Sequence, residues 1–92
     1  MRLYVWRSEA LKLYMRGTLV GVGDGADEAR EMLIAGWPEF AKDAWAYMYP
    51  ETYGGTPTES DIEDRKDKYA MFLKDLEAEP EEHDVLFIWG SE

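Results

Sequence analysis

The sequence has no cysteine and a single histidine, His83. The lack of cysteine excludes disulfides, thiolate metal ligands and a cysteine nucleophile, and one histidine excludes any site built on a histidine pair. Asparagine and glutamine are also absent, a depletion that can accompany thermophily but does not indicate an activity. No apolar run approaches the roughly 20 residues that span a bilayer, and the N-terminus lacks the pattern of a signal peptide. We therefore expect a cytoplasmic protein.

What is present is the composition of one small folded domain. Ninety-two residues predict a single domain, residues 1–92, with a modest core. Hydrophobic residues make up 46% of the chain and aromatic residues 14%. Disordered acidic tails contain far fewer residues of both kinds, so the composition predicts a folded domain.

The charge of the chain is strongly negative and unevenly distributed. Twenty acidic residues against ten basic ones give a formal net charge of −10. This argues against direct binding to nucleic acid or anionic lipid, because both need a cationic surface. Residues 1–23 hold four basic residues and one acidic residue, whereas residues 24–92 hold six basic and nineteen acidic residues. Such an uneven distribution of charge along the chain is typical of nucleic-acid mimics and of acidic binding faces. The alternative interpretation is that the acidic residues are scattered over several solvated helix faces.

Apolar alternation near the N-terminus predicts a β-hairpin or meander. Residues 3–7 and 11–16 alternate, and residues 19–22 form a short apolar strand after a turn at Gly17. Residues 85–89 form an unbroken apolar run that predicts a buried central strand beside the first ones.

Three helices are predicted between these strands. Asp24 is a good N-cap for a helix over 25–35, which Gly36 ends, and a second helix follows over 38–48. After a loop over 50–57, Thr56 and Glu59 form a capping-box pattern that begins a third helix over 57–78. The predicted fold is α+β, a small, mostly antiparallel sheet of three to four strands with about three helices packed on one face.

The segment Gly21–Ala26 matches the dinucleotide-binding pattern G-x-G-x-x-A between a strand and a helix. The chain is too short for a doubly wound domain, and Asp24 and Asp27 would repel a pyrophosphate at the helix start. We therefore interpret these glycines as thinning the end of the strand.

Two carboxylate clusters lack a specific metal or catalytic pattern. The acids of the first predicted helical turn are favoured by the helix dipole and lack the spacing of a calcium loop. The segment 81–84, Glu-Glu-His-Asp, is typical of a solvated surface. We predict no catalytic residue, no metal site and no cofactor.

The most informative functional feature is the acidity of helix 57–78 and of the stretch 75–84. Carboxylates on one helix face lie about 5–6 Å apart, close to the phosphate spacing of a DNA strand. Such a face fits a cationic groove made for nucleic acid and gains association rate by steering, although a merely solubilising face has the same composition. Nearby tyrosines combine an apolar body with a hydrogen-bonding tip. The predicted partner-binding residues are Glu59, Asp61, Asp64, Asp67, Asp75, Glu79, Glu81, Glu82, Tyr49 and Tyr53.

Short motifs at the two ends of the chain resemble a known class. They are Leu3-Tyr4-Val5-Trp6, Tyr14-x-x-Gly17, Asp27-Glu28-Ala29-Arg30 and the closing Trp89-Gly90. In these the sequence is similar to small acidic phage- and prophage-encoded proteins that open with a Y-V-W strand. The same size and charge class includes anti-CRISPR inhibitors, some of which resemble duplex DNA electrostatically. The resemblance covers about a third of the chain and assigns no functional residue.

These observations lead to the hypothesis of a phage-type, non-enzymatic inhibitor acting in the host cytoplasm. Its acidic face would block a positively charged nucleic-acid-binding surface of a host defence complex such as a CRISPR effector, with no direct binding to nucleic acid or membrane. The alternatives are an acidic structural or adaptor module and a small enzyme or metal-binding domain. A long apolar edge in so small a sheet would also favour a homodimer, by edge pairing or helix packing.

Overall fold

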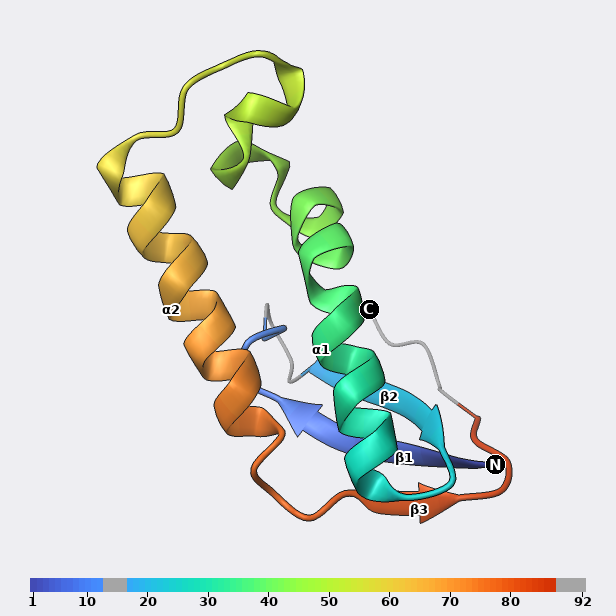
Figure 1. The fold of residues 1–92 in the computed structure, drawn as a ribbon. Coiled ribbons are helices and arrows are strands. Elements are labelled where there is room, and N and C mark those ends of the chain that lie inside the picture. Colours follow the sequence, from blue (N-terminus) through green and yellow to red (C-terminus); the bar gives the residue numbers. More distant parts are fainter. Residues whose placement is uncertain (13–16, 88–92) are drawn as a thin grey trace.

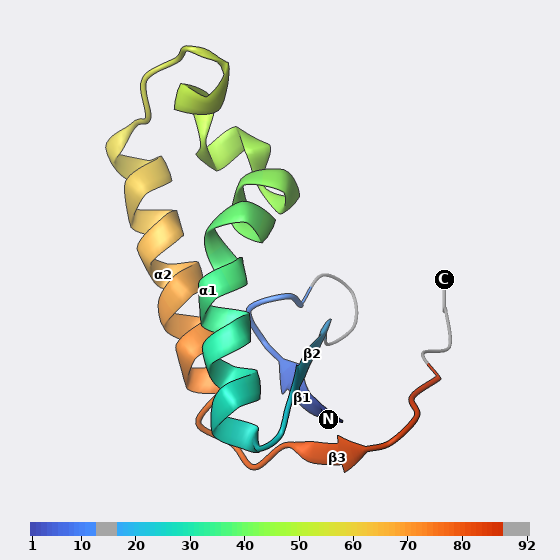
Figure 2. The same cartoon turned by 45° about the vertical axis from the view of Figure 1, so that its right-hand side comes forward.

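The computed structural model describes residues 1–12 and 17–87 of the chain. The architecture is α+β, as predicted: a three-stranded antiparallel sheet carries two α-helices on one face (Figures 1 and 2). The elements in chain order are β1 (Arg2–Ser8), β2 (Gly17–Gly23), α1 (Ala26–Ala44), the 3₁₀ helices η1 (Ala46–Met48) and η2 (Pro50–Tyr53), α2 (Glu59–Asp75) and β3 (Glu81–His83).

The sheet has the order β2-β1-β3, so the first strand is the central one. β1 and β2 form the predicted hairpin, and seven consecutive residue pairs from Arg2↔Gly23 to Ser8↔Gly17 match without a bulge. Of the predicted strand 11–16, Leu11 lies in a turn and residues 13–16 lie outside the described residues.

The prediction of a buried central strand over 85–89 is wrong for the residues that the structure describes. The acidic segment Glu81–His83 pairs with β1 instead, and Leu3 lies opposite His83. This register brings the chain to the start of β1 by residue 84, so residues 85–87 lie beyond the end of that strand and do not pair with it. Val85 and Phe87 are 66% and 91% exposed, whereas residues 88 and 89 lie outside the described part of the chain.

One helix replaces the two predicted over 25–35 and 38–48. α1 continues through Gly36 and Pro38, although a proline inside a helix costs about 3 kcal/mol. An apolar stripe with a spacing of four residues runs through both breakers and faces the core, and its members are Ala29, Leu33, Trp37 and Ala41. The burial of this continuous stripe offsets the local cost. The N-cap is Gly25 rather than Asp24, and the Asp24 carboxylate lies 3.5 Å from the N-terminal amine.

α2 begins two residues later than predicted. Its N-cap is Thr58, whose hydroxyl accepts from the Asp61 N–H at 3.1 Å, while the Thr58 N–H donates to the Asp61 carboxylate at 3.0 Å. The predicted capping box on Thr56 and Glu59 is therefore wrong. The same pattern recurs two residues later in the sequence, and there Thr58 and Asp61 form the capping box. The helix ends at Asp75 rather than at residue 78.

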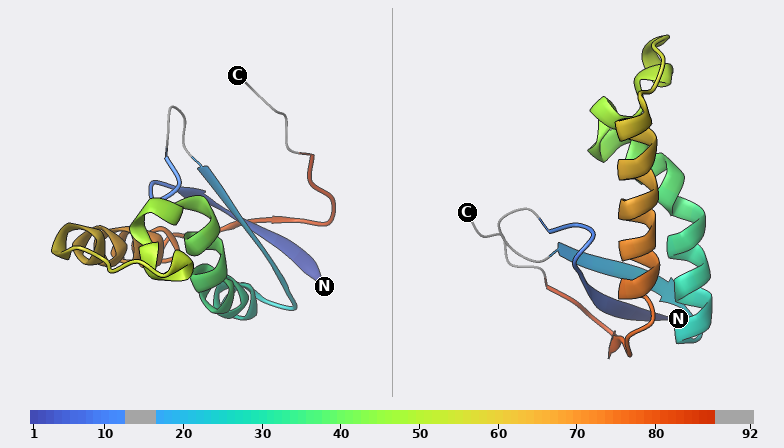
Figure 3. Two further views of the ribbon diagram at one scale, coloured as in Figure 1. Left: turned by 90° about the horizontal axis from the view of Figure 1, so that it is seen from above. Right: turned by 90° about the vertical axis from the view of Figure 1, so that its left-hand side faces the viewer.

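The core lies between the sheet and the two helices, which run side by side (Figure 3). The Trp37 ring stacks on Phe72 with centroids 4.3 Å apart, joining α1 to α2. α1 crosses β2 closely, since a Cβ atom on Gly21 would lie 2.8 Å from the Ala29 carbonyl oxygen. The glycine motif thus serves close packing of helix on strand.

Candidate acidic interaction surface

The structure separates the predicted acidic residues into groups rather than placing them on one face. α2 spans 17 residues, or about 25 Å, so its two ends are far apart. Between its first and last residues α2 holds six acidic and four basic residues. The helix is therefore not the continuous acidic face that the sequence suggested.

The N-terminal half of α2 holds Glu59, Asp64 and Asp67 in exposed positions. Asp61, also predicted to bind a partner, is partly buried and its carboxylate accepts the capping hydrogen bond. Arg65, Lys66 and Lys68 lie among these acids in the sequence, and their positive charge weakens the local negative potential.

Arg65 ties α2 to the preceding 3₁₀ helices. Its Nε donates to the Met48 carbonyl, its Nη2 lies 2.7 Å from the Glu51 carboxylate, and its guanidinium lies 4.0 Å from the centre of the Tyr49 ring. The hydrogen bond from Arg65 lowers the pKa of Glu51. Tyr49 therefore packs against Arg65, whereas Tyr53, the other predicted aromatic contact, is 80% exposed.

Asp75 is engaged inside the molecule. Its carboxylate accepts from the Ser8 hydroxyl at 2.7 Å and from the N–H groups of Glu9 and Ala10 at 3.1 and 3.2 Å. Ser8 is fully buried, and its oxygen accepts in turn from the Leu11 N–H at 3.1 Å. Asp75 thus fixes the turn after β1 against the end of α2, a role that the sequence did not reveal because the partners lie more than 60 residues apart.

The start of α1, the end of α2 and the pairing of β3 with β1 lie at the same end of the molecule (Figure 1). Acidic residues are concentrated in the sequence at this end. The sequence from 76 to 84 supplies five acids and no basic residue. The start of α1 and the turn before it add three more. We define the acidic end as Asp24, Asp27, Glu28, Glu77, Glu79, Glu81, Glu82 and Asp84.

Arg30 holds the two helix ends of this surface together. From α1 its Nε donates to the Leu76 carbonyl at 2.7 Å and its Nη2 to the Ala78 carbonyl at 3.3 Å, while Nη1 pairs with Asp27 at 2.8 Å. The Trp6 indole N–H also donates to the Ala78 carbonyl, at 2.9 Å. A cation at the C-terminus of α2 is favoured by the helix dipole, and these bonds give the acidic end a fixed shape.

Two further cations lie within the acidic end. Arg2 pairs with Glu82 at 2.9 Å and with Asp84 at 3.4 Å, and the N-terminal amine pairs with Asp24. The Tyr4 hydroxyl donates to Glu82 at 3.4 Å, and burial, followed by the Glu82 charge, raises the pKa of Tyr4. Eight carboxylates thus face Arg2, Arg30 and one amine, which leaves an excess of five negative charges.

The carboxylates of the acidic end are open to solvent. The side chains of Asp27, Asp24 and Asp84 are 96%, 80% and 76% exposed. Exposed ion pairs of this kind contribute only about 0–1 kcal/mol each, so a stronger cationic partner can compete for the carboxylates. Of the predicted contacts, Glu79, Glu81 and Glu82 belong to this surface, whereas Glu59, Asp64 and Asp67 lie along the other half of α2.

The part of the chain that the structure describes contains neither a candidate metal site nor a candidate membrane span. No group of three or more His, Asp or Glu side chains there is arranged to hold a metal ion. No described helix combines the length and the apolar character that crossing a membrane requires. Comparison with protein-family models, curated proteins and solved structures finds no match for this chain.

Proposed function

We propose that this is a non-enzymatic binding protein that docks its acidic end on a positively charged, nucleic-acid-binding surface of another protein and blocks it. The resemblance to small phage proteins supplies the class of partner, a host defence complex such as a CRISPR effector. The observation that carries the proposal is the meeting of two acidic chain segments, residues 24–28 and 77–84, at one end of the molecule, where they leave five surplus negative charges.

The physical basis is electrostatic competition with phosphates. Lysines and arginines that bind a nucleic-acid backbone attract any fixed array of anions, and such attraction raises association rates. The acidic end is held by Arg30 and by the pairing of β3 with β1. It therefore meets the partner in one arrangement, with little ordering entropy left to lose.

The test is displacement of fluorescein-labelled duplex DNA from purified CRISPR effector complexes by this protein. We expect inhibition at 0.05 M NaCl and at least a tenfold loss of affinity by 0.5 M NaCl, because the Debye length falls to a few ångströms. An affinity that does not change with salt, or no displacement from any complex tested, overturns the proposal.

A pair of charge-matched variants locates the surface. Glu77→Gln, Glu79→Gln and Glu81→Gln together remove three charges from the acidic end. Glu63→Gln, Asp64→Asn and Asp67→Asn remove the same number from α2. The first set should weaken inhibition at least tenfold, and the second by no more than about threefold. Equal losses would show that only the total charge matters and would refute the assignment to the acidic end.

A further inference from the structure

The outer edge of β2 lacks the features that normally protect an edge strand. In the described sheet β2 pairs only with β1, through seven consecutive residues without a bulge. Its sequence, Gly-Thr-Leu-Val-Gly-Val-Gly, contains no charge and no proline. The opposite edge, β3, is three residues long and carries Glu81 and Glu82. Edge strands are usually kept from pairing by charge, proline, bulges or short length, and of the two edges only β3 has such protection.

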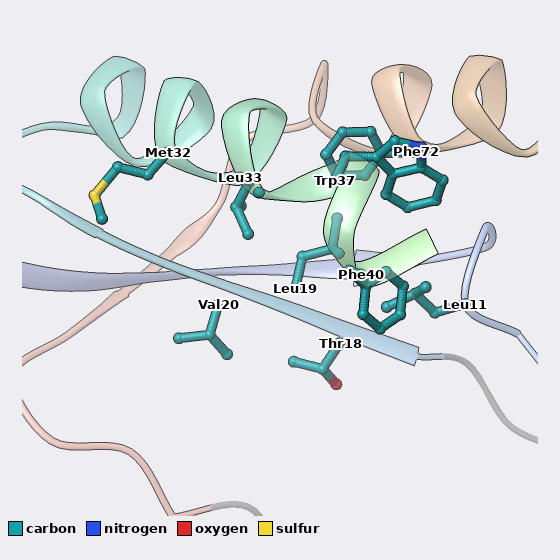
Figure 4. Close-up of a pocket in the computed structure, with 10 residues that line it drawn as sticks. Leu11, Thr18, Leu19, Val20, Met32, Leu33, Trp37, Phe40 and Phe72 are labelled. Atoms are coloured by element: carbon teal, nitrogen blue, oxygen red, sulfur yellow. The ribbon is translucent and has the colours of Figure 1, made fainter. Parts of the chain in front are cut away.

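An apolar groove of about 260 Å³ runs beside this edge, between β2 and α1 (Figure 4). Thr18, Leu19 and Val20 line it from the strand, and none of its lining residues is charged. From α1, Met32 and Phe40 line the groove while remaining 53% and 42% exposed. The edge and the groove together form an apolar surface that is open among the residues the structure describes. We call it the β2 edge surface and define it as β2 with Met32 and Phe40.

The order of residues in β2 is self-complementary. If two copies of the strand pair antiparallel about Val20, each Thr18 lies opposite a Val22 and each Leu19 lies opposite a Gly21. The first arrangement pairs β-branched side chains, which stabilise neighbouring strands. The second sets a large residue against a small one on the face of the strand that α1 covers, so the two leucines do not lie opposite each other.

Charge also favours a second copy as the occupant. Each chain carries a formal charge of −10, so most approaches of two copies bring like charges together. The β2 edge surface is uncharged and so permits contact without that repulsion. It also offers nothing to a cationic partner of the acidic end.

We propose that β2 of one copy pairs antiparallel with β2 of a second copy about a two-fold axis at Val20, joining two three-stranded sheets into one continuous sheet. Met32 and Phe40 of each copy flank the new strand pair. A standard interface buries about 800 Å² per partner, roughly an eighth of the 6825 Å² surface of this chain. The inference does not rest on the proposed function.

Sedimentation equilibrium of the full chain between 5 and 200 μM (about the range of a weak dimer) tests this proposal. We expect the mass to rise with concentration from 10.7 kDa toward twice that value. The dimer should gain at least threefold in affinity between 0.05 and 0.5 M NaCl, since salt screens the repulsion between the two copies. A chain that stays monomeric throughout overturns the proposal and leaves a strand from a different protein as the partner of β2.

Variants decide whether a dimer uses this surface. Val20→Lys places like charges opposite each other at the axis and should prevent dimerisation, and Met32→Lys should weaken it at least tenfold. Because Met32 is half-exposed on a helix, Met32→Lys keeps the test valid if Val20→Lys fails to fold. The control is Val85→Lys, which lies 66% exposed beyond the other edge of the sheet. Dimers that persist in both β2 edge variants, or that are lost only in the control, refute the assignment.

Discussion

Replacing Asp75 with alanine should lower the free energy of unfolding far more than replacing any exposed acid of α2 does. The Asp75 carboxylate accepts three hydrogen bonds from the turn Ser8–Ala10, and the Ser8 hydroxyl among them is fully buried. Alanine removes the acceptor and leaves three donors to find other partners.

The magnitude follows from the cost of hydrogen bonds to a charged group. Each such bond contributes about 1.5–3 kcal/mol, and a buried donor left unsatisfied costs about 1–3 kcal/mol. Because the three bonds share one carboxylate and water reaches part of the turn, the losses do not add in full. We expect Asp75→Ala to lower the free energy of unfolding by about 2–4 kcal/mol. In a domain of this size that corresponds to a fall in Tm of at least about 8 °C.

The assay is urea unfolding at pH 7 followed by tryptophan fluorescence. Asp75→Asn keeps one acceptor oxygen and should lose about half as much, while the exposed control Asp67→Ala should change stability by less than 0.5 kcal/mol. A double-mutant cycle with Ser8→Ala should give a coupling energy of about 1 kcal/mol or more. An Asp75→Ala variant as stable as Asp67→Ala would refute the internal role and return Asp75 to the set of partner-binding candidates.

Four further substitutions test other contacts by the same unfolding assay. Gly21→Ala should destabilise the protein by about 1–3 kcal/mol, because the added Cβ would press on the Ala29 carbonyl. Gly36→Ala, which has open space around it, should stabilise the protein by about 0.5–1 kcal/mol. Changes of the same sign for both variants would contradict the packing argument. Arg30→Met should cost about 1–3 kcal/mol, because the Leu76 carbonyl loses its guanidinium donor and the Ala78 carbonyl keeps only the Trp6 indole as a donor. No loss would show that water replaces the guanidinium. Because Arg65 lowers the pKa of Glu51, the stabilisation from this pair is complete above the ordinary value of 4.5 and disappears as the pH falls through the lowered pKa. Stability should therefore fall less steeply below pH 4.5 in Glu51→Gln than in the wild type, and identical slopes would contradict the linkage.

Local patterns predicted the elements that depend on local interactions. Alternation placed the strands over 3–7 and 19–22, which pair as β1 and β2. The segment that became β3 was missed because two glutamates and a histidine have no apolar alternation. Its place at the edge of the sheet is supported by hydrogen bonds from the side chains of Arg2 and Tyr4 to Glu82. These residues are separated from Glu82 by 80 and 78 positions in the sequence. Pairing partners at that separation leave no trace in a single sequence.

The same reason explains what the sequence showed of the candidate surface. The acidic run at 75–84 was visible as composition, and Glu79, Glu81 and Glu82 do lie on the acidic end. The contribution of Asp24, Asp27 and Glu28 was not visible, because it depends on Arg30 bringing the start of α1 to the end of α2. The internal roles of Asp61 as a helix cap and of Asp75 as an acceptor for the turn after β1 were also not visible. A sequence does not distinguish an exposed carboxylate from one that is hydrogen-bonded inside the molecule.

The dependence of affinity on salt concentration distinguishes association through the acidic end from association through the β2 edge surface. Contact through the acidic end joins opposite charges, so its affinity must fall as ionic strength rises. Contact through the β2 edge surface joins two chains of charge −10 by uncharged residues, so its affinity must rise over the same range. If both associations weakened with salt, the dimer would be held by ion pairs rather than by β2. If both strengthened, the partner would be bound through apolar contacts and the acidic end would have no part in recognition.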